Sequence, residues 1–283
     1  MNRKSALILS GVLGTFFSTS AIAALNCTAS PDCASLGYTM SAADCTDGVK
    51  VACPTDTSKV FCKTVQPVTC IVGSILGGDQ FCYKDKLPDN VKPVGIVFDT
   101  TNKLAVALTD INSSSSAGSS TTMWTTGYYD IPTLGNCTSS TDLTTCGVDG
   151  RANTTAILNC GSSCGSTPAA TATNSYEPSG CSKDFCKKTK WFLPSMRDLI
   201  ALYNAKSYVN ASLSLTASSG ATTLTESYYW SSTEYDNNNA WKLRMSDGNR
   251  NNNNKNNNNY VRPVLAYLMK NSIEAKGYAA GTF

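Results

Sequence analysis

Thirteen cysteines in two groups constrain this chain of 283 residues more than any other feature of its sequence. Disulfides stabilise small domains that cannot build a large apolar core, and they persist in oxidising compartments. No C-x-x-C pair occurs, which argues against a thioredoxin-type redox site or a zinc ribbon. We therefore expect an exported, disulfide-bonded protein. The first group is Cys27, Cys33, Cys45, Cys53, Cys62, Cys70 and Cys82, and the second is Cys137, Cys146, Cys160, Cys164, Cys181 and Cys186.

The spacing of these cysteines does not determine how they pair. The six of the second group can pair among themselves. The seven of the first group leave one over, so a free thiol, a bridge between modules and an intermolecular disulfide all stay open.

Residues 1–23 have the organisation of a secretory signal peptide. Arg3 and Lys4 precede an apolar stretch, residues 6–17, and Ala21-Ile22-Ala23 forms a small-x-small cleavage site. A transmembrane helix is the alternative, but the stretch is short and is interrupted by glycines and serines. We expect cleavage near Ala23 and export to the periplasm, the cell surface or the medium. No other segment is apolar for long enough to span a membrane.

Composition divides the mature chain at about residue 88. Residues 24–88 have few aliphatic side chains and a cysteine every 6 to 12 positions, which predicts a small module with a core made mostly of disulfides. Residues 84–92 are a predicted linker. A second domain is expected over residues 89–270, followed by a C-terminal tail, residues 271–283.

The second domain has the patterns of both strands and helices. Two apolar strands, residues 95–98 and 104–108, flank a turn and predict a hairpin. Ser195 and Asp198 form a capping-box-like start to an amphipathic helix. The expected fold class is α+β, with a mainly antiparallel sheet and two helices. The other elements expected are a helix at 149–158, strands at 228–231, 241–245 and 260–268, and loops at 112–122 and 159–180.

The chain contains no histidine, which excludes Ser-His-Asp and Cys-His catalysis and any histidine-ligated metal. Its formal net charge is +3, and the positive and negative residues are interspersed. This charge pattern does not indicate binding to nucleic acid or anionic lipid. No oxygen-ligand loop accompanies Asp236 or Asp247 that would indicate calcium. We expect no enzyme activity, no cofactor and no metal, and a hydrolase or cysteine-dependent oxidase is the least favoured alternative.

Residues 237–259 are rich in asparagine, which occupies 12 of the 23 positions. Such a tract can be a low-complexity loop that is solvated or aggregates. Here Trp241 and Leu243 alternate with Lys242 and Arg244, which predicts a half-buried strand inside the tract. The asparagine side chains are therefore expected on a folded surface, where their donors and acceptors suit adaptable recognition.

The genetic code gives the tract a second meaning. Asparagine codons begin with two adenines and end in a pyrimidine. Any change at their first two positions still gives a sense codon, because stop codons end in a purine. A run of asparagines is thus the form expected of a segment built for adenine-directed mutation.

Four motifs follow one another along the second domain. They are W-x-L-P-S at 191–195, Y-W-S-S-T-E at 229–234, A-W at 240–241 and V-R-P-V at 261–264. In this combination, over about residues 93–270, the chain resembles the Lcl C-terminal domain family, also called the Fibrobacter succinogenes major paralogous domain. That family is similar to C-type-lectin-fold domains, and its asparagine-rich members look like variable proteins of diversity-generating retroelements.

The resemblance implies that Trp230, Trp241 and the strand 261–264 are scaffold, and that the altered side chains cluster on one ligand-binding face. The partner it implies is an unknown protein or glycan ligand at a cell or phage surface. The unbroken asparagine runs depart from a diversified sequence and indicate a template-like one. The residues expected on the variable face are Asn237, Asn238, Asn239, Lys242, Arg244, Asn249, Arg250, Asn251, Asn252, Asn253, Asn254, Asn256, Asn257, Asn258 and Asn259.

The alternative is a fixed-specificity adhesin or carbohydrate-binding envelope protein. In that case the asparagine-rich loops are only solvated surface.

Overall fold

The computed structural model describes residues 33–34, 37–38, 40–41, 44–45, 48–111 and 121–268. The predicted signal peptide, Cys27, most of the predicted loop 112–122 and the predicted tail lie outside these residues. The described residues form two compact units. The smaller comprises those up to Cys45 together with Lys50–Lys63, and the larger comprises those of Thr46–Val49 and from Thr64 onward.

The smaller unit is a three-stranded sheet held by disulfides. Cys33 pairs with Cys53, and Cys45 pairs with Cys62. Cys33, Cys45, Cys53 and Val60 are the buried apolar residues in the described part of this unit, in keeping with a core made mostly of sulfur. In spatial order the strands are β1 (Met40–Ser41), β3 (Lys59–Thr64) and β2 (Gly48–Ala52).

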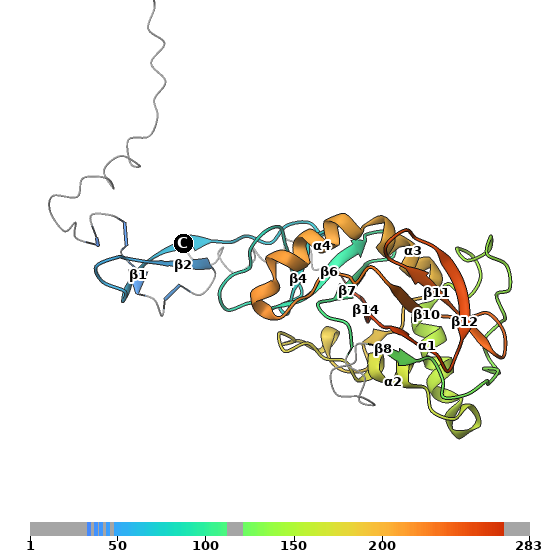
Figure 1. Cartoon of the computed structure of the whole chain (residues 1–283). Coiled ribbons are helices and arrows are strands. Elements are labelled where there is room, and N and C mark those ends of the chain that lie inside the picture. Colours follow the sequence, from blue (N-terminus) through green and yellow to red (C-terminus); the bar gives the residue numbers. More distant parts are fainter. Residues whose placement is uncertain are drawn as a thin grey trace, which may run out of the picture. The chain divides into compact units, whose positions relative to one another are not determined.

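A six-stranded antiparallel sheet forms one half of the larger unit (Figure 1). The predicted hairpin is confirmed, since β6 pairs antiparallel with β7 and both strands are buried along almost their whole length. In spatial order the strands are β5 (Cys82–Tyr83), β4 (Ile75–Gly77), β6 (Pro93–Asp99), β7 (Leu104–Ala107), β14 (Val264–Ala266) and β9 (Trp191–Phe192).

The units divide at residue 64, whereas the sequence predicted a boundary at residue 88. Ile75 and Leu76 are buried and pair with β6, and the Cys70–Cys82 disulfide ties the same segment together. The segment from Thr64 to residue 88 is therefore part of the larger fold, because its short apolar strand extends the sheet. Cysteine density alone did not reveal this.

A five-stranded sheet forms the other half and contains the asparagine tract (Figure 1). All of its pairs are antiparallel except β10 with β13, which is parallel. The expected α+β class with mainly antiparallel sheets is confirmed. In spatial order the strands are β12 (Arg250–Asn254), β11 (Asn239–Arg244), β10 (Tyr228–Glu234), β13 (Asn258–Tyr260) and β8 (Thr121–Met123).

Four α-helices occur among the described residues, of which two were expected. Asp149 caps the first, and Ser195 with Asp198 forms the predicted capping box of the third. The helices are α1 (Gly150–Asn159), α2 (Pro168–Ser175), α3 (Met196–Asn204) and α4 (Lys206–Leu215), and 3₁₀ turns occur at Gly161–Cys164, Asp184–Cys186 and Ala217–Ser219.

The prediction of an unbroken loop at 159–180 was wrong, because α2 lies within it. Pro168 occupies the first turn, where a missing N–H costs nothing, and Ala169 and Ala170 are buried. α4 was missed for a similar reason: its Ser and Asn residues favour turns locally, but Val209 and Leu213 are fully buried. In both segments packing outweighs local preference.

The strand predicted at 260–268 is divided between the two sheets. β13 ends at Tyr260 in the five-stranded sheet, and β14 begins at Val264 in the six-stranded sheet. Pro263, which cannot donate to a ladder, lies between them. Arg262 beside it is fully buried and forms an ion pair with Asp110, Nε to Oδ1 at 3.0 Å. This crossing joins the two sheets.

The main hydrophobic core packs α3 and α4 against both sheets. It contains Leu199 and Val209 from these helices, Val106 from β7, and Tyr229 and Leu243 from the five-stranded sheet. The opposite face of the five-stranded sheet has a second core, which includes Trp124 and Trp230. The centre of this sheet is thus covered on both faces, whereas its edge strand β12 is exposed or half-buried along its whole length.

Candidate functional site

The asparagine tract folds as a hairpin at the edge of the five-stranded sheet. β11 pairs with β12 in an unbroken register from Asn239 with Asn254 to Leu243 with Arg250. β12 is the outermost strand. Sequence patterns predicted the β11 strand but not β12, because asparagine has a low strand propensity.

The asparagines of β12 do not share one face of the sheet, and this corrects the expectation of a single variable face. Residues directly opposite in an antiparallel pair project to the same side. Asn252 is opposite Trp241 and so lies on the side of the main core, whereas Asn251 is opposite Lys242 on the other side. The strand presents asparagine on both faces because it is an edge strand.

Burial separates the fifteen candidate residues into three sets. The exposed set is Asn237, Asn238, Asn249, Arg250, Asn251, Asn254, Asn256, Asn257 and Asn258. The half-buried set is Asn239, Lys242, Arg244, Asn252 and Asn253. Asn259 alone is buried, because it lies on β13 between β10 and β8 and pairs with Thr122. A place for Asn259 on an exposed face was therefore wrong.

Lys255, the one residue of 251–259 that is not asparagine, is completely buried. Its ammonium donates to Glu234, to the carbonyl of Tyr129 at 2.5 Å and to the carbonyl of Asn237 at 3.0 Å. These three acceptors match its three protons. The ammonium also lies 4.9 Å from the centroid of the Trp124 ring. Sequence analysis missed this residue, although its break in the asparagine run was a signal.

Glu234 is the buried partner of Lys255. Its Oε1 accepts from Lys255 and from the backbone N–H of Ile131. Burial raises the pKa of Glu234 and lowers the pKa of Lys255, since both charged forms lose solvation. The hydrogen bonds between them oppose both shifts and hold the two groups as an ion pair.

The backbone of the tract is held at the same place. The N–H of Lys255 donates to Asn238, and its carbonyl accepts from Trp124 and Thr125. Asp236 accepts from the N–H groups of Asn238 and Asn239 and so closes the β10–β11 turn. Two asparagine turns and the segment after β8 therefore meet around Lys255.

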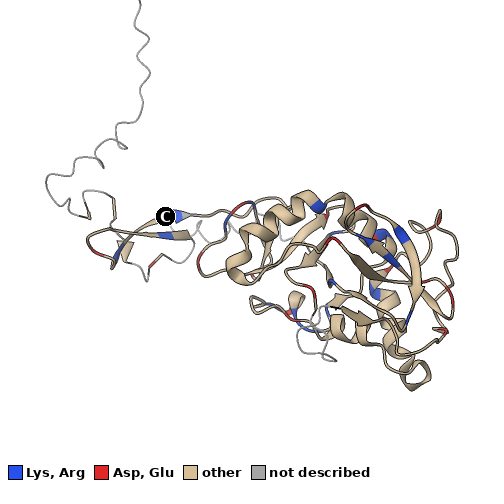
Figure 2. Ribbon diagram, in the orientation of Figure 1, with Lys and Arg blue, Asp and Glu red and all other residues tan. Residues whose placement is uncertain are grey.

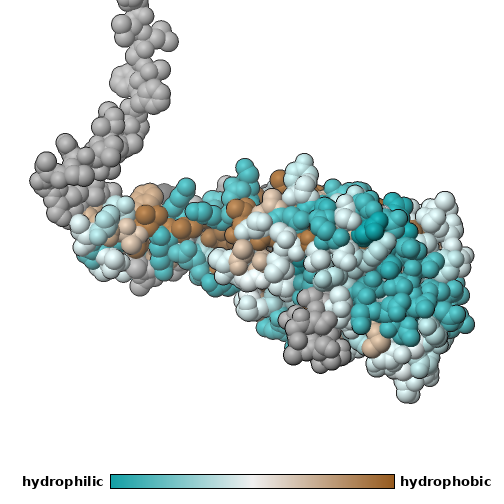
Figure 3. Space-filling model, viewed as in Figure 1, coloured by the Kyte–Doolittle hydropathy of each residue, from teal (hydrophilic) through white to brown (hydrophobic). Residues whose placement is uncertain are grey.

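The exposed side chains around this meeting point form what we call the turn surface. Tyr128 belongs to it: the side chain is 51% exposed, and its hydroxyl accepts a hydrogen bond from Asn254 at 3.2 Å. Figure 3 shows a contiguous hydrophilic area over this end of the sheet. Figure 2 shows that most residues of the protein are uncharged. The members of the turn surface are Tyr128, Asn237, Asn238, Asn254, Asn256 and Asn257.

The other end of the hairpin has a different character. Lys242 and Arg244 project away from the side of Trp241, as their alternation predicted, and both lie over the ring of Tyr228, at 4.1 and 5.2 Å from its centroid. Arg244 also pairs with Asp247, and this hydrogen-bonded guanidinium lowers the pKa of Asp247 to about 2. Burial lowers the pKa of Lys242.

The residues with the closest resemblance to catalytic groups have structural partners. Asp198 completes the capping box of α3, and burial raises its pKa. Residues 161–165 match the G-x-S-x-G pattern of serine nucleophiles, but Cys164 within this string forms a disulfide with Cys160. Asp236 and Asp247 accept backbone N–H hydrogen bonds and so close turns. The geometry of the tract thus offers amide and hydroxyl hydrogen bonds to a ligand.

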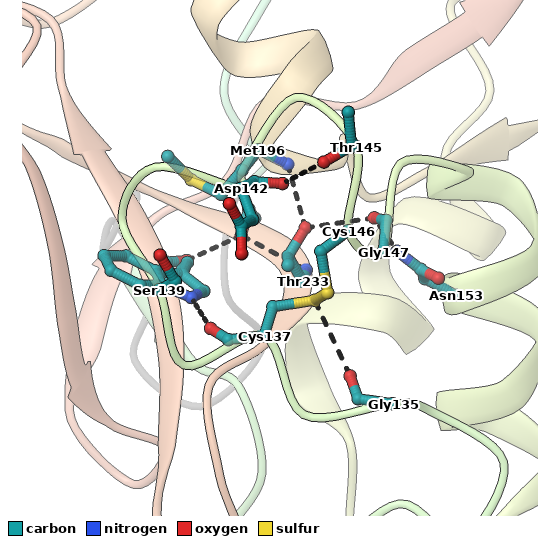
Figure 4. The surroundings of a disulfide bond; sticks show 12 residues. Gly135, Cys137, Ser139, Asp142, Thr145, Cys146, Gly147, Asn153, Met196 and Thr233 are labelled. Carbon is teal, nitrogen blue, oxygen red and sulfur yellow. Dashed lines mark hydrogen bonds between the residues drawn. A yellow bond between two sulfur atoms is a disulfide. The ribbon is translucent and has the colours of Figure 1, made fainter.

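A disulfide-closed loop lies against Thr233 of β10 (Figure 4) and also contacts Trp241 of the hairpin. Cys137 bonds to Cys146, its N–H donates to the backbone carbonyl of Glu234 at 3.0 Å, and its own carbonyl accepts from the Trp241 indole at 2.6 Å. Thr233 of β10 donates to the carbonyl of Gly147, just beyond the disulfide. All six cysteines of the second group pair among themselves, with Cys181–Cys186 as the third bond.

Removing this disulfide is expected to destabilise the larger unit. In the double variant Cys137→Ala/Cys146→Ala the unfolded chain regains the conformational entropy that the short disulfide loop had removed. The free energy of unfolding is expected to fall by about 2–3 kcal/mol. The melting temperature should fall by about 4–12 °C. Calorimetry of the oxidised proteins measures the difference. An unchanged melting temperature would mean that the loop does not support Trp241.

These features define a disulfide-bonded α+β protein. Its five-stranded sheet has a hydrophobic core on each face and carries exposed asparagine turns. The model of the Lcl C-terminal domain matches residues 123–265, from the end of β8 into β14. The chain belongs to this family. The match covers the whole tract, the neighbouring strand β10 and the Lys255 site.

Other comparisons add less. No curated protein matches the chain. The crystal structure of a fimbrial protein from Bacteroides ovatus ATCC 8483 is similar to it with 17% identity and a TM-score of 0.48, over 70% of this chain and 49% of that one. The chain thus spans about half the length of that protein.

The disulfides agree with an exported protein, since such bonds persist in oxidising compartments. Within the described ranges, no helix has the length and apolar character that a membrane crossing requires.

Proposed function

We propose that this chain is an exported, non-enzymatic ligand-binding protein whose binding site is the asparagine hairpin with its turn surface. The observation that carries the proposal is the division of the tract by burial. Lys255 and Trp241 are buried and fixed by hydrogen bonds, whereas most of the asparagine side chains are exposed around them. A rigid frame with polar, adaptable side chains is the arrangement found in recognition surfaces.

The proposal includes a C-type-lectin-like scaffold and diversification of the tract. Family membership and the α+β architecture support the first. The codon argument supports the second, since asparagine positions tolerate adenine-directed change, and the exposure of these positions means that most changes leave the core intact. The unbroken asparagine runs correspond to a sequence that has not yet been rewritten.

Sequencing of the gene and a few kilobases on either side, from many cells of one culture, tests this proposal. We expect a near-copy of the DNA for 237–259 that differs only at adenines, beside a reverse transcriptase gene. We also expect the codons for Lys255 and Asn259 to vary less among cells than those of the exposed asparagines, because these two side chains are buried. The absence of a copy, with identical reads from every cell, would refute diversification.

A fixed-specificity adhesin or carbohydrate-binding protein is the second candidate, and the exposed Tyr128 ring favours it. An exposed aromatic ring beside a hydrogen-bonding amide, here Asn254, suits a sugar. Binding on a glycan array that survives alanine at Asn251, Asn256 and Asn257 but is lost in Tyr128→Ala would favour this candidate. Loss of binding in the asparagine variants would favour the first.

A further inference from the structure

We propose that Lys255 is the positioning residue of the turn surface: its ammonium fixes the two asparagine turns and the Tyr128 segment in one arrangement, whatever side chains those turns carry. This inference deepens the proposed function and rests on it. It predicts which part of a variable tract has to stay constant.

The contacts of Lys255 reach three other segments. Its ammonium binds Glu234 at the end of β10, the Asn237 carbonyl in the β10–β11 turn and the Tyr129 carbonyl beside Tyr128. Its backbone binds Asn238 and the residues after β8. No other residue of 237–259 in the described structure has a fully buried side chain that bonds to both a turn and the segment after β8.

The acceptors on the turns are backbone carbonyls, and this makes the arrangement independent of side-chain identity. Asn237 and Tyr129 contribute main-chain oxygens that every amino acid provides. Substitutions at Asn237, Asn256 or Asn257 therefore leave the Lys255 contacts in place. The same surface shape can then be combined with many side chains.

Lysine suits this position better than any other residue. Its ammonium supplies three donors in a tetrahedral arrangement, matching one carboxylate and two carbonyls from different directions. The guanidinium of arginine is planar and larger than an ammonium, so it does not fit three acceptors that surround a fully buried position from different directions. A neutral side chain leaves the buried Glu234 without its cation, with only the Ile131 N–H as a partner, and leaves both carbonyls without the ammonium donor.

The test separates this positioning role from simple stabilisation. In Lys255→Met alone, Glu234 is left as an unpaired buried charge and the protein is expected to lose stability. In the double variant Glu234→Leu/Lys255→Met the charge is gone, and the melting temperature should recover most of that loss, because apolar residues can replace a buried ion pair. The turns nevertheless still lack their ammonium donor.

Hydrogen–deuterium exchange with mass spectrometry on the double variant is the decisive measurement. We expect amides in the turns at 236–239 and 254–258 to exchange at least about tenfold faster than in the parent protein, while those of β6 and β7 keep their rates. The matched control is Lys206→Met. Lys206 also contacts a glutamate, Glu226, and a backbone carbonyl, that of Met245, but at a distance from the turns in sequence and sheet.

Two results would overturn the inference. One is parent-like exchange at both turns in the double variant. The other is equal acceleration in Lys206→Met. A failure to find a diversifying near-copy of the gene would refute the proposed function without changing these exchange rates, so the two outcomes can be told apart. If the double variant does not fold, Lys255→Met measured below its melting temperature gives the same comparison.

Discussion

Alanine in place of Trp241 is expected to destabilise the larger unit by about 3–5 kcal/mol, the usual cost of removing a large buried aromatic ring. Trp241 is 4% exposed and packs in the main core, where its ring meets Tyr235 edge-on at 5.3 Å. The substitution also leaves the Cys137 carbonyl without the indole donor. The melting temperature should fall by about 6–20 °C.

Trp230→Ala is expected to behave in the same way on the opposite face of the sheet. Its ring is fully buried and its indole donates to the carbonyl of Thr122 at 2.9 Å. Asn252→Ala and Asn257→Ala are the controls, with changes within about 0.5 kcal/mol, because neither side chain is buried. Thermal unfolding followed by circular dichroism measures all four. Asparagine variants as destabilising as the tryptophan variants would make the tract structural and contradict the proposed binding surface.

Arg262→Met is the second substitution with a large expected effect, again about 3–5 kcal/mol. Arg262 is buried between the two sheets, where it pairs with Asp110 and donates to the carbonyl of Thr222 at 2.7 Å. Without it the Asp110 carboxylate has no cation and keeps only hydrogen bonds from Tyr229 and Thr225. Denaturant unfolding at pH 7 measures the loss, and Lys187→Met at an exposed ion pair with Glu177 is the control.

The cost of Arg262→Met is expected to depend on pH. Burial already raises the pKa of Asp110, and the loss of the arginine raises it further. A carboxyl whose pKa is higher in the folded than in the unfolded state stabilises the fold below the unfolded pKa, and this contribution disappears as the pH rises through the folded pKa. The cost is therefore largest at neutral pH and shrinks as the pH approaches about 4. A cost that is constant between pH 4 and 7 would contradict this assignment.

Local patterns predicted the elements that carry strong local signals. The hairpin β6–β7 follows from two apolar runs around a turn, and α3 follows from the spacing of Met196, Leu199 and Ile200 after a capping residue. α2, α4 and β12 were not predicted, because Ser, Thr and Asn favour turns when considered alone. Those segments are held by packing and strand pairing: Val209 and Leu213 of α4 are buried, and β12 pairs with β11.

The candidate site shows the same limit. Sequence patterns placed Trp241 inside and Lys242 outside, because a strand alternates with a period of two. They did not predict that Asn259 is buried or that Asn251 and Asn252 lie on opposite faces, since both facts depend on the neighbouring strands. Tyr128 is more than a hundred residues from Asn254, and no local pattern relates them.

The sequence by itself determined the chemistry available to this protein. Without histidine and with thirteen cysteines, it specified a disulfide-bonded chain, an asparagine-rich tract and the motifs of its family. Only the tertiary structure decided which side chains of that tract are exposed to solvent. Burial depends on what packs around a side chain. Lys255 is buried among exposed asparagines because two turns, β10 and the segment after β8 meet around it.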